Sequence, residues 1–335
     1  MDVFLKKVCG LFILAGSLTA CNTPDPEFSA PVISERIAFS ASRQYPEGIT
    51  YSSQLDQFLV SSITQGKVGK VDLNGRYEDI IASDTSLISA IGIKVNNGKL
   101  YVCNSDQGVS TKSKPGTTLT TAGLFVYDLA SGASVARYDL AKLYPNSKHF
   151  ANDIAFDANG NAYVTDSFAP VIYKIPSDTT QPSALYSPLF AGTEGFNLNG
   201  IVYHPDNFLI VVKSNEGTLF KIDLNNTSIL PKQILGPTLP NGDGMVFYNN
   251  DLYVVNNRNR VSRLRSTDNW NTFAIVETDS TGYNQATTNV AVNGRIYTLN
   301  ARIEEVNKAV AAKNPSLLQA SDYSIQQFKS SLSGN

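Results

Sequence analysis

The chain has 335 residues, of which 42% are hydrophobic and 17% are charged, so it can bury a large core. Its formal net charge of -2 gives no basic field, which excludes a nucleic-acid partner. Tyr and Phe occur 16 times each, and this composition favours strands over helices. Three cysteines and two histidines form no disulfide framework and no zinc motif.

Residues 1–21 have the features of a secretory signal. Lys6 and Lys7 supply positive charge, and the apolar run at residues 11–15 is too short to span a membrane. The segment ends in Leu18-Thr19-Ala20-Cys21, which resembles the bacterial lipobox. The resemblance implies cleavage before Cys21 and lipid attachment to it, so we expect an exported cell-envelope lipoprotein, held at the membrane only by its acyl chains. The alternative is an ordinary cleaved signal.

Residues 22–35 are interrupted by prolines, and we expect them to form an extended, flexible tether. The remaining chain, residues 36–335, is expected to form one domain, because it is built from repeats of a single unit that could not bury its apolar faces alone.

This unit is a strand, a tight turn and a second strand. Its clearest copy is residues 152–167, where Asn159-Gly160 marks the turn. The first strand recurs six times, starting at Glu47, Ile91, Asn152, Asn199, Asp243 and Thr288. A third strand and in most units a weaker fourth strand follow, such as residues 134–138. The spacing of roughly 45 residues is typical of propeller blades.

The sequence therefore predicts an all-β fold, a six-bladed β-propeller of four-stranded antiparallel blades. The sixth unit lacks an obvious fourth strand, whereas residues 36–40 alternate in polarity and belong to no unit. We expect residues 36–40 to complete the last blade and so to close the ring.

The first positions of the six first strands should surround one mouth of the central channel. Four of them, Glu47, Asn152, Asn199 and Asp243, carry carboxylate or amide oxygens. Hard oxygen donors of this kind suit Ca²⁺, Mg²⁺ or another divalent cation, and four of them would leave coordination positions open for water or substrate. The alternative is that each is an ordinary turn residue, since Asn, Asp and Glu are common before glycine in turns.

A second polar column stands at the ends of the second strands, near the same mouth. It consists of Ser61, Asn104, Asp166, Lys213, Asn256 and Asn300. We interpret it as a polar wall around the cation, with Asp166, Lys213, Asn256 and Asn300 as substrate-binding candidates. The alternative is a set of solvated strand ends.

Three long connections are expected on this face. They span residues 106–121, 141–151 and 302–321, and the last includes a helix-like stretch at residues 304–310. Long loops on one face commonly shape a binding site, although they also arise as neutral surface growth.

Four segments resemble the signature segments of the senescence marker protein/gluconolactonase (regucalcin-like) family, which is similar to diisopropyl fluorophosphatase. They are Tyr45-Pro46-Glu47-Gly48, Asn152-Asp153, Leu198-Asn199-Gly200 and Gly242-Asp243-Gly244-Met245. The resemblance implies a six-bladed propeller with a divalent cation in the channel and hydrolysis of lactones or phosphoesters. It also implies that Glu47, Asn152, Asn199 and Asp243 are the metal ligands and that Asp243 is the catalytic base or nucleophile.

One position departs from the family. Sugar-lactone members tend to carry an Arg where this chain has Phe150. An arginine would make a charge-assisted contact with a polar sugar acid, so Phe150 points to a more apolar substrate or to no enzymatic role.

The leading hypothesis is a Ca²⁺-dependent hydrolase of lactone- or ester-type small molecules, acting as a monomer. A non-enzymatic propeller that binds a ligand or protein with a structural cation is the alternative. A metal-free propeller similar to strictosidine synthase is a third, which the oxygen column argues against.

Overall fold

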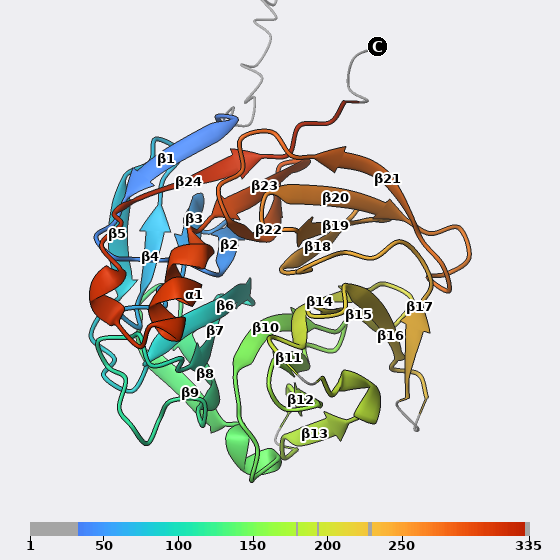
Figure 1. The fold of residues 1–335 in the computed structure, drawn as a ribbon, viewed down its shortest axis with the longest axis horizontal. Coiled ribbons are helices and arrows are strands. Elements are labelled where there is room, and N and C mark those ends of the chain that lie inside the picture. The colour runs from blue at the N-terminus through green and yellow to red at the C-terminus, as the bar shows by residue number, and fades with distance from the viewer. Residues whose placement is uncertain (1–32, 179, 193, 227–229, 332–335) are drawn as a thin grey trace, which may run out of the picture. The chain divides into compact units, whose positions relative to one another are not determined.

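The structure, a computed structural model, describes residues 33–331 except residues 179, 193 and 227–229. These residues form six four-stranded antiparallel sheets around a ring, as predicted (Figure 1). The compact unit includes Ile33, which is buried, and its first strand begins at Arg36. The predicted signal, with Cys21, lies outside the described residues. In the described ranges no helix has the length and apolar character that a membrane span requires.

Within each blade, hydrogen-bonded neighbours are consecutive in the chain except where the ring closes. Blades one to three contain β2 (Ile49–Ser52), β3 (Gln57–Val60), β4 (Val68–Val71), β5 (Tyr77–Ile81); β6 (Ser89–Asn96), β7 (Lys99–Ser105), β8 (Ala122–Asp128), β9 (Ser134–Asp139); β10 (Ala151–Phe156), β11 (Ala162–Asp166), β12 (Val171–Ile175), β13 (Ser183–Tyr186). Blades four to six contain β14 (Leu198–His204), β15 (Phe208–Lys213), β16 (Thr218–Asp223), β17 (Pro231–Ile234); β18 (Met245–Tyr248), β19 (Asp251–Asn256), β20 (Arg260–Arg265), β21 (Ala274–Asp279); β22 (Ala286–Val292), β23 (Arg295–Asn300), β24 (Asp322–Gln327), β1 (Arg36–Ser40).

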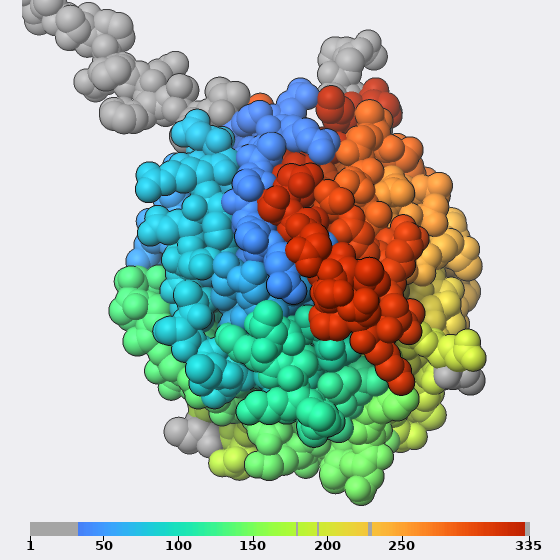
Figure 2. Space-filling view, turned by 60° about the vertical axis from the view of Figure 1, so that its left-hand side comes forward, coloured from blue at the N-terminus to red at the C-terminus, as the bar shows by residue number. Residues whose placement is uncertain are grey.

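The longest helix of the described chain is α1 (Ile303–Ala311), which confirms the helix expected near residues 304–310. Short 3₁₀ turns occur at Ala141–Leu143, Pro188–Phe190 and Pro315–Leu317. Figure 2 shows the red segment that carries α1 packed over the propeller surface, next to the blue-green chain of blade two.

The ring closes as the sequence predicts. Strand β1 pairs antiparallel with β24, with Arg36 opposite Gln326 and Ser40 opposite Asp322. Apolar side chains continue across the closure, because Phe39 contacts the ring of Tyr323 with centroids 5.7 Å apart. The N-terminal strand thus covers the edge that β24 would otherwise expose.

The innermost strands approach one another closely around the channel. Two glycines show why, because a Cβ added to Gly92 would overlap the Asn152 carbonyl and one added to Gly200 would overlap the Asp243 carbonyl. Each glycine therefore lets a first strand lie directly against the backbone of the next one.

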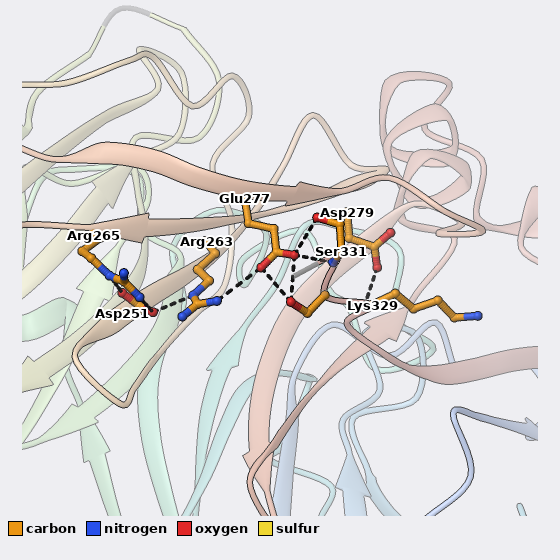
Figure 3. A network of polar contacts seen from close by, with 8 residues as sticks. Asp251, Arg263, Arg265, Glu277, Asp279, Lys329 and Ser331 are labelled. Atoms are coloured by element: carbon orange, nitrogen blue, oxygen red, sulfur yellow. Dashed lines mark hydrogen bonds and ion pairs between the residues drawn. The ribbon is translucent and has the colours of Figure 1, made fainter. Parts of the chain in front are cut away.

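The C-terminal tail joins blade six to blade five through a buried polar network (Figure 3). The buried carboxylate of Asp251 accepts hydrogen bonds from Arg263 and Arg265. Arg263 also reaches Glu277, which accepts hydrogen bonds from Ser330 and Ser331 of the tail. The backbone N–H of Lys329 donates to Asp279 at 2.8 Å. We call Asp251, Arg263, Arg265, Glu277 and these tail contacts the clasp.

Because the clasp contains buried carboxylates, we expect the stability of the fold to decrease in acid. Burial alone would raise the pKa of Glu277, but hydrogen bonds from Ser330, Ser331 and Arg263 outweigh it, and the pKa is lowered. The pKa of Asp251 is lowered in the same way by Arg265 and Arg263, against burial. A carboxyl group whose pKa is lower in the folded state stabilises the fold at every pH above its unfolded-state pKa, which is about 4. This stabilisation is lost as the pH falls through the folded-state pKa.

Thermal unfolding of Glu277→Gln should test this contribution. We expect the variant to lose about 1–2 kcal/mol of stability at pH 7, and its melting temperature to fall less than that of the wild type between about pH 5 and pH 3. The control is Glu78→Gln, whose exposed pair with Lys70 should contribute little. Equal acid sensitivity of Glu277→Gln and wild type would contradict the assignment.

Candidate functional site

The four oxygen-bearing residues of the first column converge on one cavity. Asn152 lies in β10 and Asn199 in β14, while Glu47 and Asp243 lie just before β2 and β18. All four line a cavity of about 200 Å³. Of the other two column positions, Thr288 lines only a smaller adjoining space and Ile91 is fully buried.

Local irregularities turn the column residues toward the channel. The pairing of β10 with β11 shifts register between Ala151 and Ile154, and the pairing of β14 with β15 shifts between Leu198 and Ile201. Asn152 and Asn199 lie within these shifts. β-Bulges re-aim side chains and are common beside functional sites, so the shifts give a local reason for the convergence.

Hydrogen bonds from neighbouring strands hold the column in place. The Ser61 hydroxyl accepts from the backbone N–H groups of Glu47 and Gly48, at 3.2 and 2.8 Å. The Asn152 amide nitrogen donates to the Ser167 hydroxyl at 3.0 Å, which directs the amide oxygen away from Ser167. The Ser167 hydroxyl in turn donates to the Leu198 carbonyl at 2.6 Å, beside Asn199.

Two of the four side chains have a buried oxygen without a partner. The Oδ1 atoms of Asn199 and Asp243 accept no hydrogen bond from the described residues. An unpaired buried amide or carboxylate oxygen is costly, and coordination to a cation would remove this cost. The described residues contain no group of three or more His, Cys, Asp or Glu that could hold a metal, so the donor set depends on the two amides. Hard oxygen donors of this kind fit Ca²⁺ or Mg²⁺.

The electrostatics of the site also favour a positive charge. Burial, together with the charges of Asp243 and Asp153, raises the pKa of Glu47 well above its ordinary value. Burial and the charge of Asp153 raise the pKa of Asp243 to about 7. Neighbouring carboxylates in a buried site resist simultaneous ionisation, and a cation between them would relieve that resistance.

One wall of the cavity is aromatic. Phe150 and Phe196 line it, and their rings pack edge to face with centroids 5.3 Å apart. Phe168 supports both rings from behind, with centroids 6.0 Å from Phe150 and 5.1 Å from Phe196. Phe150 therefore lines the cavity, although only 2% of its surface is exposed.

Asp166 and Lys213 have structural partners instead. Buried Asp166 accepts from the backbone N–H groups of Phe150, Phe168 and Ala169 and from the Tyr173 hydroxyl. It also bonds His149 Nδ1 at 2.8 Å. Lys213 Nζ donates to the carbonyls of Leu189 and Ala191 and pairs with Glu216. Neither residue lines the cavity.

Asn256 and Asn300 are likewise buried and outside the cavity lining. Asn256 donates to the Ser262 hydroxyl at 2.8 Å. Asn300 accepts from the backbone N–H of Asn284 at 2.8 Å and donates to the Ser324 hydroxyl. The structure thus brings Phe150, but not the other four substrate-binding candidates, to the cavity. Those four hold strands and loops in place.

Several cavity residues belong to neither of the two predicted columns. Asn215 and Arg258 line the cavity and stand two positions after the second-column residues of units four and five. In unit three that position is Phe168. Units four and five thus place this position in the cavity lining, whereas Phe168 packs against the lining rings of Phe150 and Phe196.

The long connections reach the cavity as expected. Residues 106–121 contribute Gln107, residues 141–151 contribute Phe150, and residues 302–321 contribute Ile303 and Asn307 of α1.

Comparison with known proteins adds structural relatives at low sequence identity. No family model and no curated protein sequence matches the chain. The allergen Mala s 1 of Malassezia sympodialis superposes with a TM-score of 0.71 at 17% identity, covering 91% of this chain and 98% of that one. A gluconolactonase from Xanthomonas campestris gives 0.59 at 12% identity, covering 88% and 89%. The calcium-binding protein regucalcin from Agrobacterium tumefaciens gives 0.57 at 16% identity, covering 86% and 94%. The chain is thus a six-bladed propeller that is structurally similar to the gluconolactonase and regucalcin family.

Proposed function

We propose that the protein is a divalent-cation-dependent hydrolase of small lactones or esters, with Ca²⁺ as the first cation to test. The observation that carries the proposal is the convergence of Glu47, Asn152, Asn199 and Asp243 on one cavity, with two of their buried oxygens unpartnered. The structural relatives named gluconolactonase and regucalcin support this direction through the shared fold.

The four column residues would hold the cation through their side-chain oxygens. A bound divalent cation supplies Lewis-acid polarisation of the carbonyl and compensates charge that develops on its oxygen. Asp243 has the position and chemistry to orient a water molecule and accept its proton as the water oxygen attacks the carbonyl carbon. The bond from that carbon to the alkoxy oxygen then breaks, and the leaving oxygen takes up a proton, which gives a carboxylic acid and an alcohol.

The aromatic wall would set the kind of substrate. Phe150 and Phe196 can pack against an apolar group and exclude water from that side of the cavity. The cavity volume of about 200 Å³ limits the occupant to a small molecule. These features favour an apolar or aromatic ester over a sugar lactone.

We also propose that the protein is exported and attached to the cell envelope through lipid on Cys21, and that it acts as a monomer. The support for the anchor is the lipobox-like sequence that ends at Cys21.

Cation binding should stabilise the fold. Added Ca²⁺ at about 100 times its dissociation constant should contribute about 2.7 kcal/mol, visible as a rise in melting temperature. Asn152→Ala should weaken this response because it removes one donor, whereas the exposed turn residue Asn74 offers a matched control as Asn74→Ala. No Ca²⁺-dependent rise in the wild type, with Mg²⁺ also inactive, would contradict the cation site.

Hydrolysis should depend on Asp243. We expect Asp243→Asn to lower kcat/KM for aryl esters or lactones by about 10²–10⁴-fold, the range for loss of a general base. The control is Asp206→Asn, since Asp206 is exposed and outside the cavity. If the wild type with Ca²⁺ turned over no lactone, aryl ester or organophosphate, the propeller would instead be a non-enzymatic binding protein.

A further inference from the structure

Among the described residues that line the cavity, Arg258 is the one whose side chain is positively charged. Arg258 lies in the turn after β19, where Asn257 and Arg258 both have left-handed backbone, with φ of 47° and 59°. The turn is held by the Asn257 N–H, which donates to the Pro240 carbonyl, and by the Ala286 N–H, which donates to the Arg258 carbonyl, both at 2.6 Å. Backbone of this kind is uncommon outside glycine and is often found at functional sites.

The charge of Arg258 is not neutralised by a close carboxylate. Arg263, Arg265 and Arg302 all form ion pairs with acidic side chains. Within the described residues, no acidic side chain lies within ion-pair distance of Arg258. The positive charge of Arg258 lowers the pKa of Asp243, although burial has the larger and opposite effect.

The neutral amide of Asn307 holds the guanidinium in place. In the amide orientation that satisfies both groups, the Asn307 oxygen accepts from the two terminal nitrogens of Arg258 at 3.1 and 3.2 Å. Asn307 belongs to α1 and lines the same cavity. A half-buried guanidinium, positioned by an uncharged partner and facing a cavity, is well suited to binding an anionic oxygen group.

The cavity is therefore asymmetric. Phe150 and Phe196 come from the connections into blades three and four, whereas Arg258 and Asn307 come from blades five and six. The oxygen column lines the same cavity. A ligand that used all three features would carry an apolar group, a carbonyl group and an anionic group.

The geometry points to one substrate class, an ester or lactone that carries both an anionic group and an apolar or aromatic group. Arg258 binds the anionic group, and the apolar group packs on Phe150 and Phe196. This inference rests on the proposed function. Arg258 is a specificity-determining residue in this account. Arg258 supplies the positive charge from the turn after β19 in blade five.

Matched esters test the inference. Mono(4-nitrophenyl) glutarate carries a free carboxylate, and 4-nitrophenyl pentanoate is its neutral counterpart of similar length. With full-length protein and Ca²⁺, we expect kcat/KM to favour the anionic ester by about tenfold or more, the size of one charge-assisted hydrogen-bond pair. Arg258→Gln should abolish this preference and Arg258→Lys should retain part of it. Arg137→Gln, on blade two outside the cavity, should leave the ratio unchanged.

A binding measurement separates this inference from the proposed function. Calorimetry with 4-phenylbutanoate and 4-phenylbutan-1-ol requires no turnover, and the wild type should bind the carboxylate about tenfold more tightly. If the wild type hydrolyses no ester but binds the carboxylate more tightly, and Arg258→Gln loses this preference, the proposed hydrolase function is rejected and the anion site is supported. Two results would overturn the anion site, whether or not esters are hydrolysed. One is a wild-type preference for the neutral compounds. The other is an anionic preference that survives in an Arg258→Gln variant with a native melting temperature.

Discussion

The close approach of the six innermost strands is the constraint on which the site depends. Gly92 and Gly200 permit it, because any side chain there would overlap the backbone carbonyls of Asn152 and Asp243 on the next blade. Ring closure by β1 and the clasp at the C-terminal tail hold the blades in this arrangement from outside. Residues far apart in sequence are thereby held close enough to share one ligand.

This convergence has an electrostatic cost that the fold itself does not offset. Glu47 and Asp243, both half-buried, are brought together in the cavity, and desolvation raises the pKa of both. A protein selected only for stability would not need such an arrangement, whereas a cation-binding site does. The lining of the same cavity also includes the aromatic rings of Phe150 and Phe196 and the guanidinium of Arg258.

The repeat made the fold predictable, because the strand–turn–strand pattern recurs in register and its first positions must meet at a propeller axis. The ring closure by residues 36–40 followed from the strand that the sixth unit lacked. The second column was harder to interpret. Its polarity suggested a wall of the binding site, but Asp166 and Asn300 are buried and bond the loops that surround them. Arg258 was missed because it stands two residues beyond the strand end, outside both columns, and Asn307 was missed because the helix α1 sets its position.

The most direct test of the central claim is anomalous diffraction from crystals grown with Ca²⁺ or a heavier calcium surrogate. The account predicts one strong anomalous peak in the channel, bounded by side-chain oxygens of Glu47, Asn152, Asn199 and Asp243. A channel without such a peak at saturating cation, or a peak bound by other residues alone, would contradict it.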